Sequence, residues 1–422
     1  MAITNLTVSN FKSFKHLDLN LGRFNVVIGA NASGKSNFVE IFKFLRTIEQ
    51  ENLEDAISLH GGHESILNKK LGSSELLRMR ATSDRQMPWG GGWANLQVHE
   101  TTYDFSLQLR GSQNEASITG DHFTQKLCTK ISGEDAEMTF DVFISEKKIG
   151  FKIGPDDVVD RLEKERASLE NASHRPSHED FENLKTIVTA MLESKRKVLL
   201  IQHPALFALA GPFEALFERV GVYDVDPHAV KRPHETAGRA SLEENGENLA
   251  LVLKHVLADP EKSRKFHNLL RYMLPFAVEV GTEQYLGESV LWKLREEYYK
   301  DGLLVNLLSD GTVDVVALIT ALFFEEKDVI IIEEPERNIH PRLISGLLEL
   351  MKDASRNKQI IVTTHSPEVV KHAGLENLLL ISRDKEGFST ISRPAEKEAV
   401  KIFLQHDLGL DDLFVQDLLA VP

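Results

Sequence analysis

The stretch FNVVIGANASGKSNFVEIFKFL, residues 24–45, decides the fold. It begins with an apolar run at 24–28 that is typical of a buried strand. The next segment has the pattern Gly-x-x-x-x-Gly-Lys-Ser, from Gly29 to Ser36. Apolar residues then recur at the spacing of a helix face. The predicted order is therefore strand, loop, helix.

The residue types at the key positions of this loop are those that phosphate binding requires. Gly29 and Gly34 let the backbone turn tightly, so that successive N–H groups and the following helix N-terminus point at an anion. Lys35 supplies positive charge for the β- and γ-phosphates, and Ser36 offers a hydroxyl to Mg²⁺. A glycine-rich turn with an incidental lysine is the alternative, and the strand and helix on either side disfavour it. The stretch predicts a P-loop NTPase of the α/β class.

The amino-acid composition and the net charge limit the classes of function that the protein can have. The chain has 422 residues, of which 42% are hydrophobic and 27% charged, as in an ordinary folded protein. Its net charge of −15 argues against a protein whose whole surface binds nucleic acid. Two basic clusters stand out, 195–197 and the group Lys231, Arg232 and Arg239. We interpret both as solvated charge, with a local DNA-binding patch as the alternative.

Cysteine usage and hydropathy indicate the compartment. The single cysteine, Cys128, excludes an internal disulfide and a zinc site built from several cysteines. The N-terminus lacks the charged and apolar regions of a signal peptide. The most apolar window, 198–217, is interrupted by proline and polar residues, so we expect no membrane span. We expect a cytoplasmic protein.

The chain changes character twice along its length. Residues 1–155 alternate strand-like runs with turns, 156–275 are mostly charged and helical in pattern, and strand patterns return from 276. We predict an α/β head split in two. Its N-terminal part would be 1–155, a mainly helical insertion acting as a lid or dimerisation arm would be 156–275, and its C-terminal part would be 276–422.

Two further apolar runs end in polar groups. The run DVIIIEEP, 328–335, predicts a buried strand that ends at Glu333 and Glu334. We expect Glu333 to hold Mg²⁺ opposite Ser36, and Glu334 to polarise the water that attacks the γ-phosphate. The run QIIVTTHSP, 359–367, predicts a strand that ends at His365, which could hydrogen-bond the γ-phosphate.

A helix start lies between these motifs. The segment LLSDGT, 307–312, precedes a helical pattern that runs to about Phe324. Ser309 stands where an N-cap is expected, with N–H groups and a helix dipole available to a phosphate. Periodicity does not separate a plain helix cap from a phosphate contact.

Five motifs occur in a familiar order: NFKSF at 10–14, GANASGKSN, LLSDGT, IIIEEPERNIHP and VTTHSP. Together they resemble the ABC-type ATPase heads of the RecF, SMC and OLD family. The closest resemblance is to compact prokaryotic AAA-type ATPases of the anti-phage defence kind, such as the ATPase component of PARIS-like systems. The resemblance implies an ABC-ATPase head with a mixed sheet. It also implies that two heads enclose two ATP molecules, each between one P-loop and the other head's signature segment.

The resemblance also assigns residues. Glu334 would be the catalytic base and His365 the switch histidine, while Ser36 and Glu333 would serve Mg²⁺. Ser309 and Gly311 would reach the γ-phosphate bound to the partner head. The residues that would bind ATP in this chain are Lys12, Gly29, Asn31, Ala32, Ser33, Gly34, Lys35, Ser36 and Asn37.

The sequence departs from the family at two points. SDGT, 309–312, replaces the SGGQ of transporter-like signatures. A Q-loop glutamine has no clear place, because Gln86 lies far from a clear strand boundary. The position of that residue is therefore left open.

Three functions remain in view. The first is an ATPase that assembles around ATP, as a head-to-head dimer or a larger ring of dimers, and that senses or gates a separate effector such as a TOPRIM-type nuclease. The second is a RecF- or SMC-like ATPase of DNA repair or maintenance, with DNA as its partner. The third is a nucleotide-dependent scaffold that does not hydrolyse ATP, although the intact Glu334 and His365 argue against it.

Overall fold

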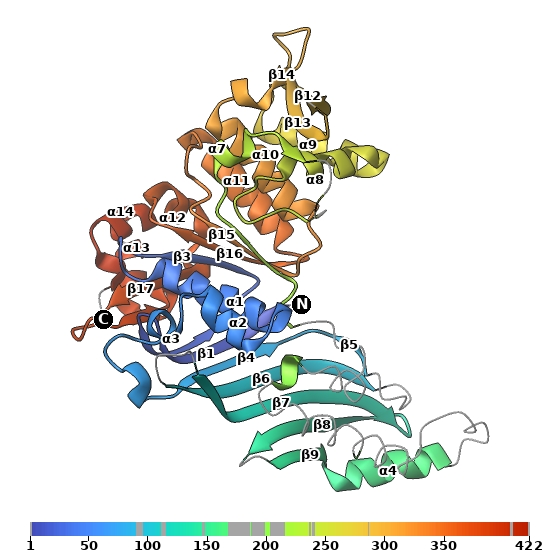
Figure 1. Cartoon of the computed structure of the whole chain (residues 1–422). Helices are drawn as coiled ribbons and strands as arrows, with labels where there is room; N and C mark the ends of the chain where they lie inside the picture. Colours follow the sequence, from blue (N-terminus) through green and yellow to red (C-terminus); the bar gives the residue numbers. More distant parts are fainter. Residues whose placement is uncertain are drawn as a thin grey trace. The chain divides into compact units, whose positions relative to one another are not determined.

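The computed structural model describes most of the chain, in two compact units (Figure 1). The first unit consists of Met1–Leu21, Glu40–Glu218 and Arg383–Thr390, and the second of Gly22–Val39, Arg219–Ser382 and Ile391–Pro422. The described residues are 2–89, 96–110, 115–145, 148–167, 186, 199–202, 216–235, 238, 241–285, 287–405 and 408–420. The basic cluster 195–197 and Arg239 lie outside them.

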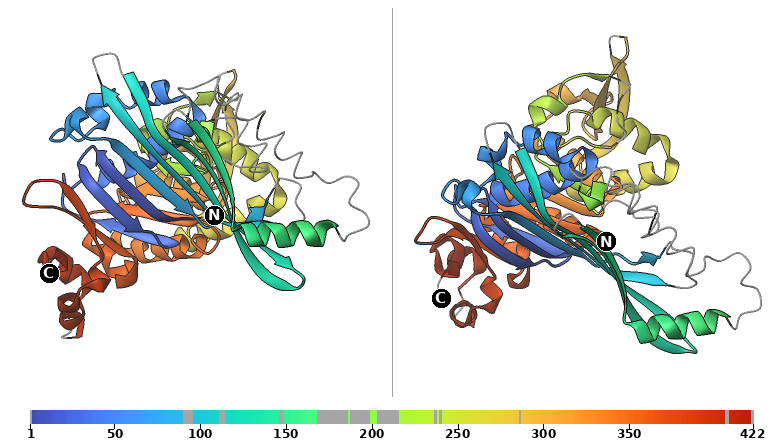
Figure 2. Two further views of the ribbon diagram at one scale, coloured as in Figure 1. Left: turned by 90° about the horizontal axis from the view of Figure 1, so that it is seen from below. Right: turned by 60° about the horizontal axis from the view of Figure 1, so that its bottom comes forward.

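The first unit is built on an antiparallel sheet of eight strands in the order β2-β1-β4-β6-β7-β8-β9, with β5 paired to β6. Buried and solvent-facing residues alternate along β6, which gives the sheet one covered face. Figure 2 shows the twist of the long strands. The strands are β1 (Ile3–Phe11), β2 (Phe14–Asn20), β4 (Leu77–Ser83), β5 (Met87–Pro88), β6 (Gln97–Arg110), β7 (Glu115–Ile131), β8 (Glu134–Ser145) and β9 (Lys148–Gly154).

In the described part of the first unit, four α-helices accompany this sheet. Helix α1 begins in the second unit and continues into the first at Glu40. On α1, Phe44 packs against Phe11 of β1, with ring centroids 5.8 Å apart. Helix α4 packs beside β8 and β9. The bounds are α1 (Lys35–Gln50), α2 (Leu53–Leu59), α3 (His63–Ile66) and α4 (Asp156–Ala167).

Most of the sheet that carries the predicted motifs belongs to the second unit. Its order is β10-β15-β16-β3-β17-β18, and the first five strands run parallel. The side chains of β3 and β16 are all buried, as expected for parallel strands covered on both faces. The strands are β3 (Phe24–Ile28), β10 (Val220–Tyr223), β15 (Val329–Glu333), β16 (Gln359–Thr364), β17 (Leu378–Arg383) and β18 (Ser389–Ser392).

A small antiparallel sheet and several helices complete the second unit. The sheet has the order β11-β13-β12, with β14 paired to β13, and Trp292 on β13 is fully buried. Its strands are β11 (His234–Glu235), β12 (Ala277–Tyr285), β13 (Ser289–Glu296) and β14 (Leu303–Leu304). The helices are α7 (Pro227–Val230), α8 (Leu249–Ala258), α9 (Pro260–Met273), α10 (Asp310–Phe323), α11 (Pro341–Ala354), α12 (Pro367–Ala373), α13 (Glu398–Gln405) and α14 (Leu410–Val415).

The fold class is the predicted one, α/β, with parallel and antiparallel strands and the glycine-rich loop between a parallel strand and a helix. The described part of 156–275 holds α4, α7, α8 and α9 and also strands β10 and β11, and β10 pairs with β15. The division into 1–155, 156–275 and 276–422 stays a prediction. None of the described helices combines the length and apolar composition that crossing a membrane requires.

A buried carboxyl group in the first unit gives the fold a pH dependence. Asp121 on β7 is 2% exposed, and its Oδ2 accepts the Leu200 N–H at 2.7 Å. Burial raises the pKa of Asp121 to about 7, although the Leu200 N–H lowers it. The folded state therefore holds this proton at a higher pH than the unfolded chain does. The resulting stabilisation is present in acid and is lost as the pH rises through about 7.

We expect Asp121→Asn to stabilise the chain by roughly 1–3 kcal/mol more at pH 8 than at pH 5, because the wild-type carboxyl group costs stability as it ionises and an amide does not ionise. Thermal unfolding of the full chain at both pH values measures this. The matched control is Asp135→Asn, an exposed position at the start of β8. An equal effect of Asp121→Asn at the two pH values would contradict the assignment.

Candidate functional site

The predicted phosphate loop joins β3 to α1 in the second unit. Lys35 is the first residue of α1, and its Nζ donates to the carbonyl oxygens of Gly29 at 2.7 Å and Ala30 at 3.2 Å. The ammonium group therefore lies within the loop that it is predicted to serve. Burial lowers the pKa of Lys35, although the charges of Glu334 and Glu336 raise it.

Backbone geometry explains the glycines of this loop. A Cβ on Gly29 would stand 2.4 Å from the Ile381 carbonyl oxygen and 2.8 Å from Ser33 Oγ, so no side chain fits there. Gly34 has φ of 119°, in the region that favours glycine, and Ala32 has φ of 61°. The Ser36 side chain follows on the first turn of α1 and is exposed. These positions give the loop the tight turns that a phosphate-binding backbone needs.

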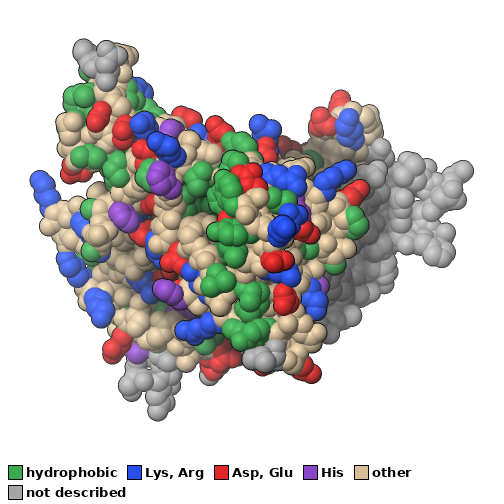
Figure 3. Space-filling model, turned by 90° about the horizontal axis from the view of Figure 1, so that it is seen from above, with side chains coloured by type: hydrophobic (Ala, Val, Ile, Leu, Met, Phe, Trp, Pro, Cys, Tyr) green, Lys and Arg blue, Asp and Glu red, His purple; other side chains and the backbone are tan. Residues whose placement is uncertain are grey.

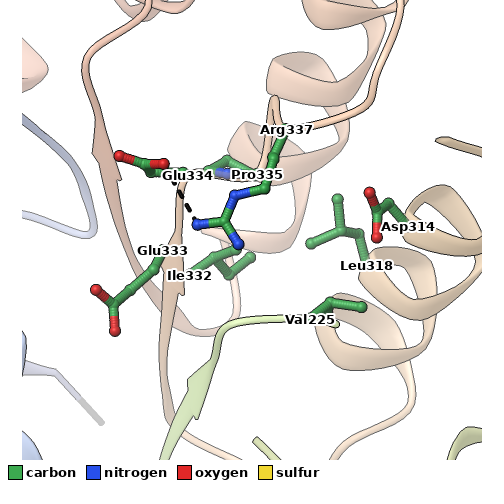
Figure 4. A pocket seen from close by; sticks show the side chains of 8 residues that line it. All are labelled: Val225, Asp314, Leu318, Ile332, Glu333, Glu334, Pro335 and Arg337. Atoms are coloured by element: carbon green, nitrogen blue, oxygen red, sulfur yellow. Dashed lines mark hydrogen bonds and ion pairs between the residues drawn. The ribbon is translucent and has the colours of Figure 1, made fainter. Parts of the chain in front are cut away.

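The two predicted acids follow β15 through a turn. Glu333 is the last residue of the strand, and Glu334 has φ of 45°, in the left-handed region. Such a conformation costs a non-glycine residue about 1–2 kcal/mol. The Glu334 N–H donates to the Thr363 carbonyl at 2.9 Å, which ties the turn to the end of β16. Figure 4 shows the two carboxylates at separate positions.

Glu334 has a partner on each carboxylate oxygen. Its Oε1 lies 2.8 Å from Nδ1 of His365, and its Oε2 accepts from the Arg337 guanidinium at 3.3 Å. Burial alone would raise the pKa of Glu334, but His365 and Arg337 together lower it below its ordinary value. The carboxylate is therefore ionised at neutral pH, the state that a general base requires.

Glu336 is a third acid of this motif, which the sequence reasoning missed. Its Oε1 accepts from Thr364 Oγ1 at 2.5 Å, and Thr364 Oγ1 in turn accepts the Ser366 N–H at 2.9 Å. Among the described residues, its buried Oε2 has no hydrogen-bond partner. Burial raises the pKa of Glu336. The acid two residues after Glu334 in the run EEPE is the signal that could have found it.

The predicted signature segment begins α10. Ser309 is the N-cap, and its Oγ accepts the Thr312 N–H at 3.2 Å, so the predicted helix cap is confirmed. Lys231 forms an ion pair with Asp310, which places one of the predicted basic residues against this helix start. A Cβ on Gly311 would stand 2.4 Å from the Asn338 carbonyl oxygen. Packing within this chain therefore explains why position 311 is a glycine. The contact of Gly311 with a partner's phosphate stays a prediction.

Lys12 belongs to the first unit and has φ of 45°. Its Nζ lies 3.3 Å from Oε2 of Glu40, which also interacts with His60. The hydrogen bond from His60 is the main reason that the pKa of Glu40 falls to about 2. The predicted approach of Lys12 to a nucleotide stays a prediction.

The second unit has a small pocket beside the acid motif (Figure 4). The buried Asp314 of α10 accepts from Asn338 Nδ2 at 3.1 Å, and burial raises its pKa to about 6. The lining residues are Val225, Asp314, Leu318, Ile332, Glu333, Glu334, Pro335 and Arg337. Acidic groups from α10 and from the end of β15 thus line one pocket.

The oxygen donors at this sheet edge fit Mg²⁺. The hydroxyl of Ser36 and the carboxylate of Glu333 are the ligand types that this hard cation takes, and phosphate oxygens and waters complete its shell in nucleotide sites. Glu336 Oε2, which has no hydrogen-bond partner in the described part of the chain, is a further oxygen three residues after Glu333. The residues present therefore suit a Mg–nucleotide complex.

Two family models match the chain. The family described as "AAA ATPase domain" matches residues 1–188, and the family described as "AAA domain, putative AbiEii toxin, Type IV TA system" matches residues 192–371. The first match contains the P-loop, and the second contains the signature segment, the acid motif and His365. Both halves of the chain thus resemble AAA-type ATPase domains.

Relatives with curated names match shorter parts of the chain. The DNA replication and repair protein RecF of Desulforudis audaxviator is 32% identical over 116 residues, 25% of this chain and 32% of that protein. Endonuclease GajA of Bacillus cereus is 31% identical over 71 residues, 17% of this chain and 12% of that protein. The matches thus span less than a third of either relative. An SMC head bound to the C-winged helix domain of ScpA aligns with 93% of this chain and 97% of that chain, at 13% identity and a TM-score of 0.47.

We expect Gly311→Ala to destabilise the chain by roughly 1–3 kcal/mol, because the added Cβ would collide with the Asn338 carbonyl. Alanine inside a helix ordinarily stabilises a protein relative to glycine. A loss of stability in Gly311→Ala would therefore point to the collision. Gly346→Ala in α11 is the matched control, since its nearest contacts are at the ordinary distances of 3.4 Å and more. Urea unfolding measures both variants, and equal stability of the two would contradict the packing argument.

Proposed function

We propose that this protein binds Mg-ATP at the P-loop and hydrolyses it to ADP and phosphate. The observation that carries the proposal is the ionised Glu334, held 2.8 Å from His365 at the sheet edge where the P-loop begins. A carboxylate that is charged at neutral pH and stands next to a histidine can accept a proton from an attacking water.

Each residue has a defined task in this proposal. The loop N–H groups and Lys35 bind the phosphates, and Ser36 and Glu333 hold Mg²⁺. The metal ion, when bound, neutralises charge that develops on the β- and γ-oxygens. Glu334 takes the proton of the attacking water, and His365 keeps that carboxylate oriented while its ring can also meet the γ-phosphate. Asn31, Ala32, Ser33 and Asn37 contribute loop contacts.

We infer further that two copies of the chain share the nucleotide. Ser309 is an exposed N-cap at the start of a fourteen-residue helix, and Leu307 just before it is 68% exposed. Free N–H groups of a helix start and an apolar neighbour together suit contact with a phosphate held by another copy. A head-to-head dimer, or a ring of such dimers, would place Ser309 and Gly311 there.

The proposed biological role is an ATPase subunit that senses or gates a separate effector in anti-phage defence. Its support is the resemblance of the five motifs, the partial match to a protein named an endonuclease, and a family description that mentions a toxin system. A TOPRIM-type nuclease is the expected effector.

DNA repair or maintenance is the second candidate, because one relative is named a DNA replication and repair protein. The surface gives this role limited electrostatic support. On the face seen in Figure 3, Lys and Arg side chains are interleaved with Asp and Glu. Lys231, from one of the two basic clusters, is paired with Asp310.

We expect Glu334→Gln to bind ATP, to lose roughly 10²–10⁴-fold in hydrolysis rate, and to accumulate an ATP-bound assembly, because the amide spares Mg²⁺ binding but does not accept the proton. Adding Ser309→Arg should disperse that assembly, since a bulky side chain would block the partner's phosphate. Lys35→Ala is the control that should not bind ATP. Light-scattering mass and nucleotide content, with and without Mg-ATP, measure these outcomes.

Wild-type hydrolysis by Glu334→Gln would show that another group is the base. An assembly that survives Ser309→Arg would reject the shared nucleotide site. Because Ser309 is exposed, the arginine meets no clash, and loss of the cap on the Thr312 N–H should cost the single chain only about 1 kcal/mol.

Purification with the proteins of its own cell separates the two biological roles. We expect a nuclease to co-elute with the chain and its ATP turnover to be insensitive to DNA. ATP turnover that DNA stimulates, with no nuclease bound, would favour the role in DNA maintenance instead.

A further inference from the structure

Arg337 lies between two carboxylates in the second unit. One guanidinium nitrogen donates to Oε2 of Glu334 at 3.3 Å, and another donates to Oδ1 of Asp224 at 3.0 Å. Figure 4 shows the Arg337 side chain directed toward Glu334, and Arg337 and Glu334 both line the pocket. The Arg337 side chain is 49% exposed, so it has room to exchange partners.

This contact opposes the proposed task of Glu334. A base must aim a free lone pair at the water and must attract its proton. In this structure, one carboxylate oxygen of Glu334 is within hydrogen-bond distance of His365, and the other accepts a hydrogen bond from Arg337. A neighbouring cation also makes a carboxylate a weaker proton acceptor.

Asp224 is a fixed competitor for the same guanidinium. It follows β10, and its N–H donates to the Glu244 carbonyl at 2.9 Å. Two residues later, the Asp226 N–H donates to the Asn245 carbonyl at 3.0 Å. The segments VYDVDP, 222–227, and ENGEN, 244–248, are thus joined through their backbones, and the first presents the Asp224 carboxylate to Arg337.

We propose that Arg337 restrains the catalytic carboxylate of Glu334, and that Asp224 is the acceptor that draws Arg337 away when hydrolysis proceeds. Arg337 is then a positioning residue that sets how much of the time Glu334 can meet water. The proposal rests on the assignment of Glu334 as the base. It gives the VYDVDP segment a role that nucleotide binding alone does not.

The restraint predicts opposite signs for two substitutions. We expect Arg337→Gln to raise kcat for ATP roughly fivefold with KM nearly unchanged, because a partly exposed ion pair is worth about that factor. Asp224→Asn should lower kcat about threefold, because Arg337 would lose its other carboxylate partner and would stay bound to Glu334. The double variant should behave like Arg337→Gln alone.

A conservative variant separates this role from a structural one. Arg337→Lys keeps the positive charge beside Glu334 and should keep kcat near the wild-type value, whereas Arg337→Gln should raise it. Glu336, His365 and Asp314 also face this region and are present in every variant. Arg356→Gln, at an 80% exposed arginine paired with Asp353, is the matched control.

A second measurement does not depend on catalysis. Double-mutant cycles in urea unfolding, Glu334→Gln with Arg337→Gln and Asp224→Asn with Arg337→Gln, should each show favourable coupling. If the wild-type chain does not hydrolyse ATP, the proposed function is wrong. The double-mutant cycles would then still measure whether Arg337 interacts with Glu334. The inference is overturned by absent coupling to Glu334, by an unchanged or lower kcat in Arg337→Gln, or by the same direction of change in Asp224→Asn.

Discussion

Backbone pairing between β15, β16 and β3 is the constraint on which the site depends. In this register, Glu333 lies beside Thr363 and Thr364 lies beside Ile28. Because the strands are parallel, their carboxyl ends meet at one edge, and the residues that follow them converge there. The P-loop, the acid turn and His365 are widely separated in the sequence and are brought together by these few hydrogen bonds.

Close backbone contacts then fix the groups at this edge. Gly29 lies against the Ile381 carbonyl, and Gly311 lies against the Asn338 carbonyl. The turn at Glu334 holds a left-handed conformation through its N–H bond to Thr363. Strain of this kind persists where the surrounding structure determines the backbone, and it is frequent at functional sites. The geometry of the candidate site is thus supported mainly by main-chain packing.

Charge at the site is balanced within the second unit. Lys35 lies near Glu334 and Glu336, Arg337 lies between Glu334 and Asp224, and Lys231 pairs with Asp310. Each pairing lowers the cost of holding like charges close together. The sequence suggested solvated charge for Lys231, and the structure shows a specific partner, because the fold places α7 next to the start of α10.

The sequence by itself determined the glycine-rich loop, the succession of strand, loop and helix around it and the helix cap at Ser309. Each of these depends on neighbours along the chain: an apolar run, a glycine spacing, a cap before a helix. It also placed the end of the first strand at Glu333 and Glu334 and the end of the second at His365, each within one residue of the observed ends of β15 and β16. Tertiary structure alone decided the pairings of Glu334 with His365 and Arg337, the link from Arg337 to Asp224, and the burial of Glu336. These contacts join residues from different strands and loops, so their distances follow from the packing of the sheet, which no local pattern encodes.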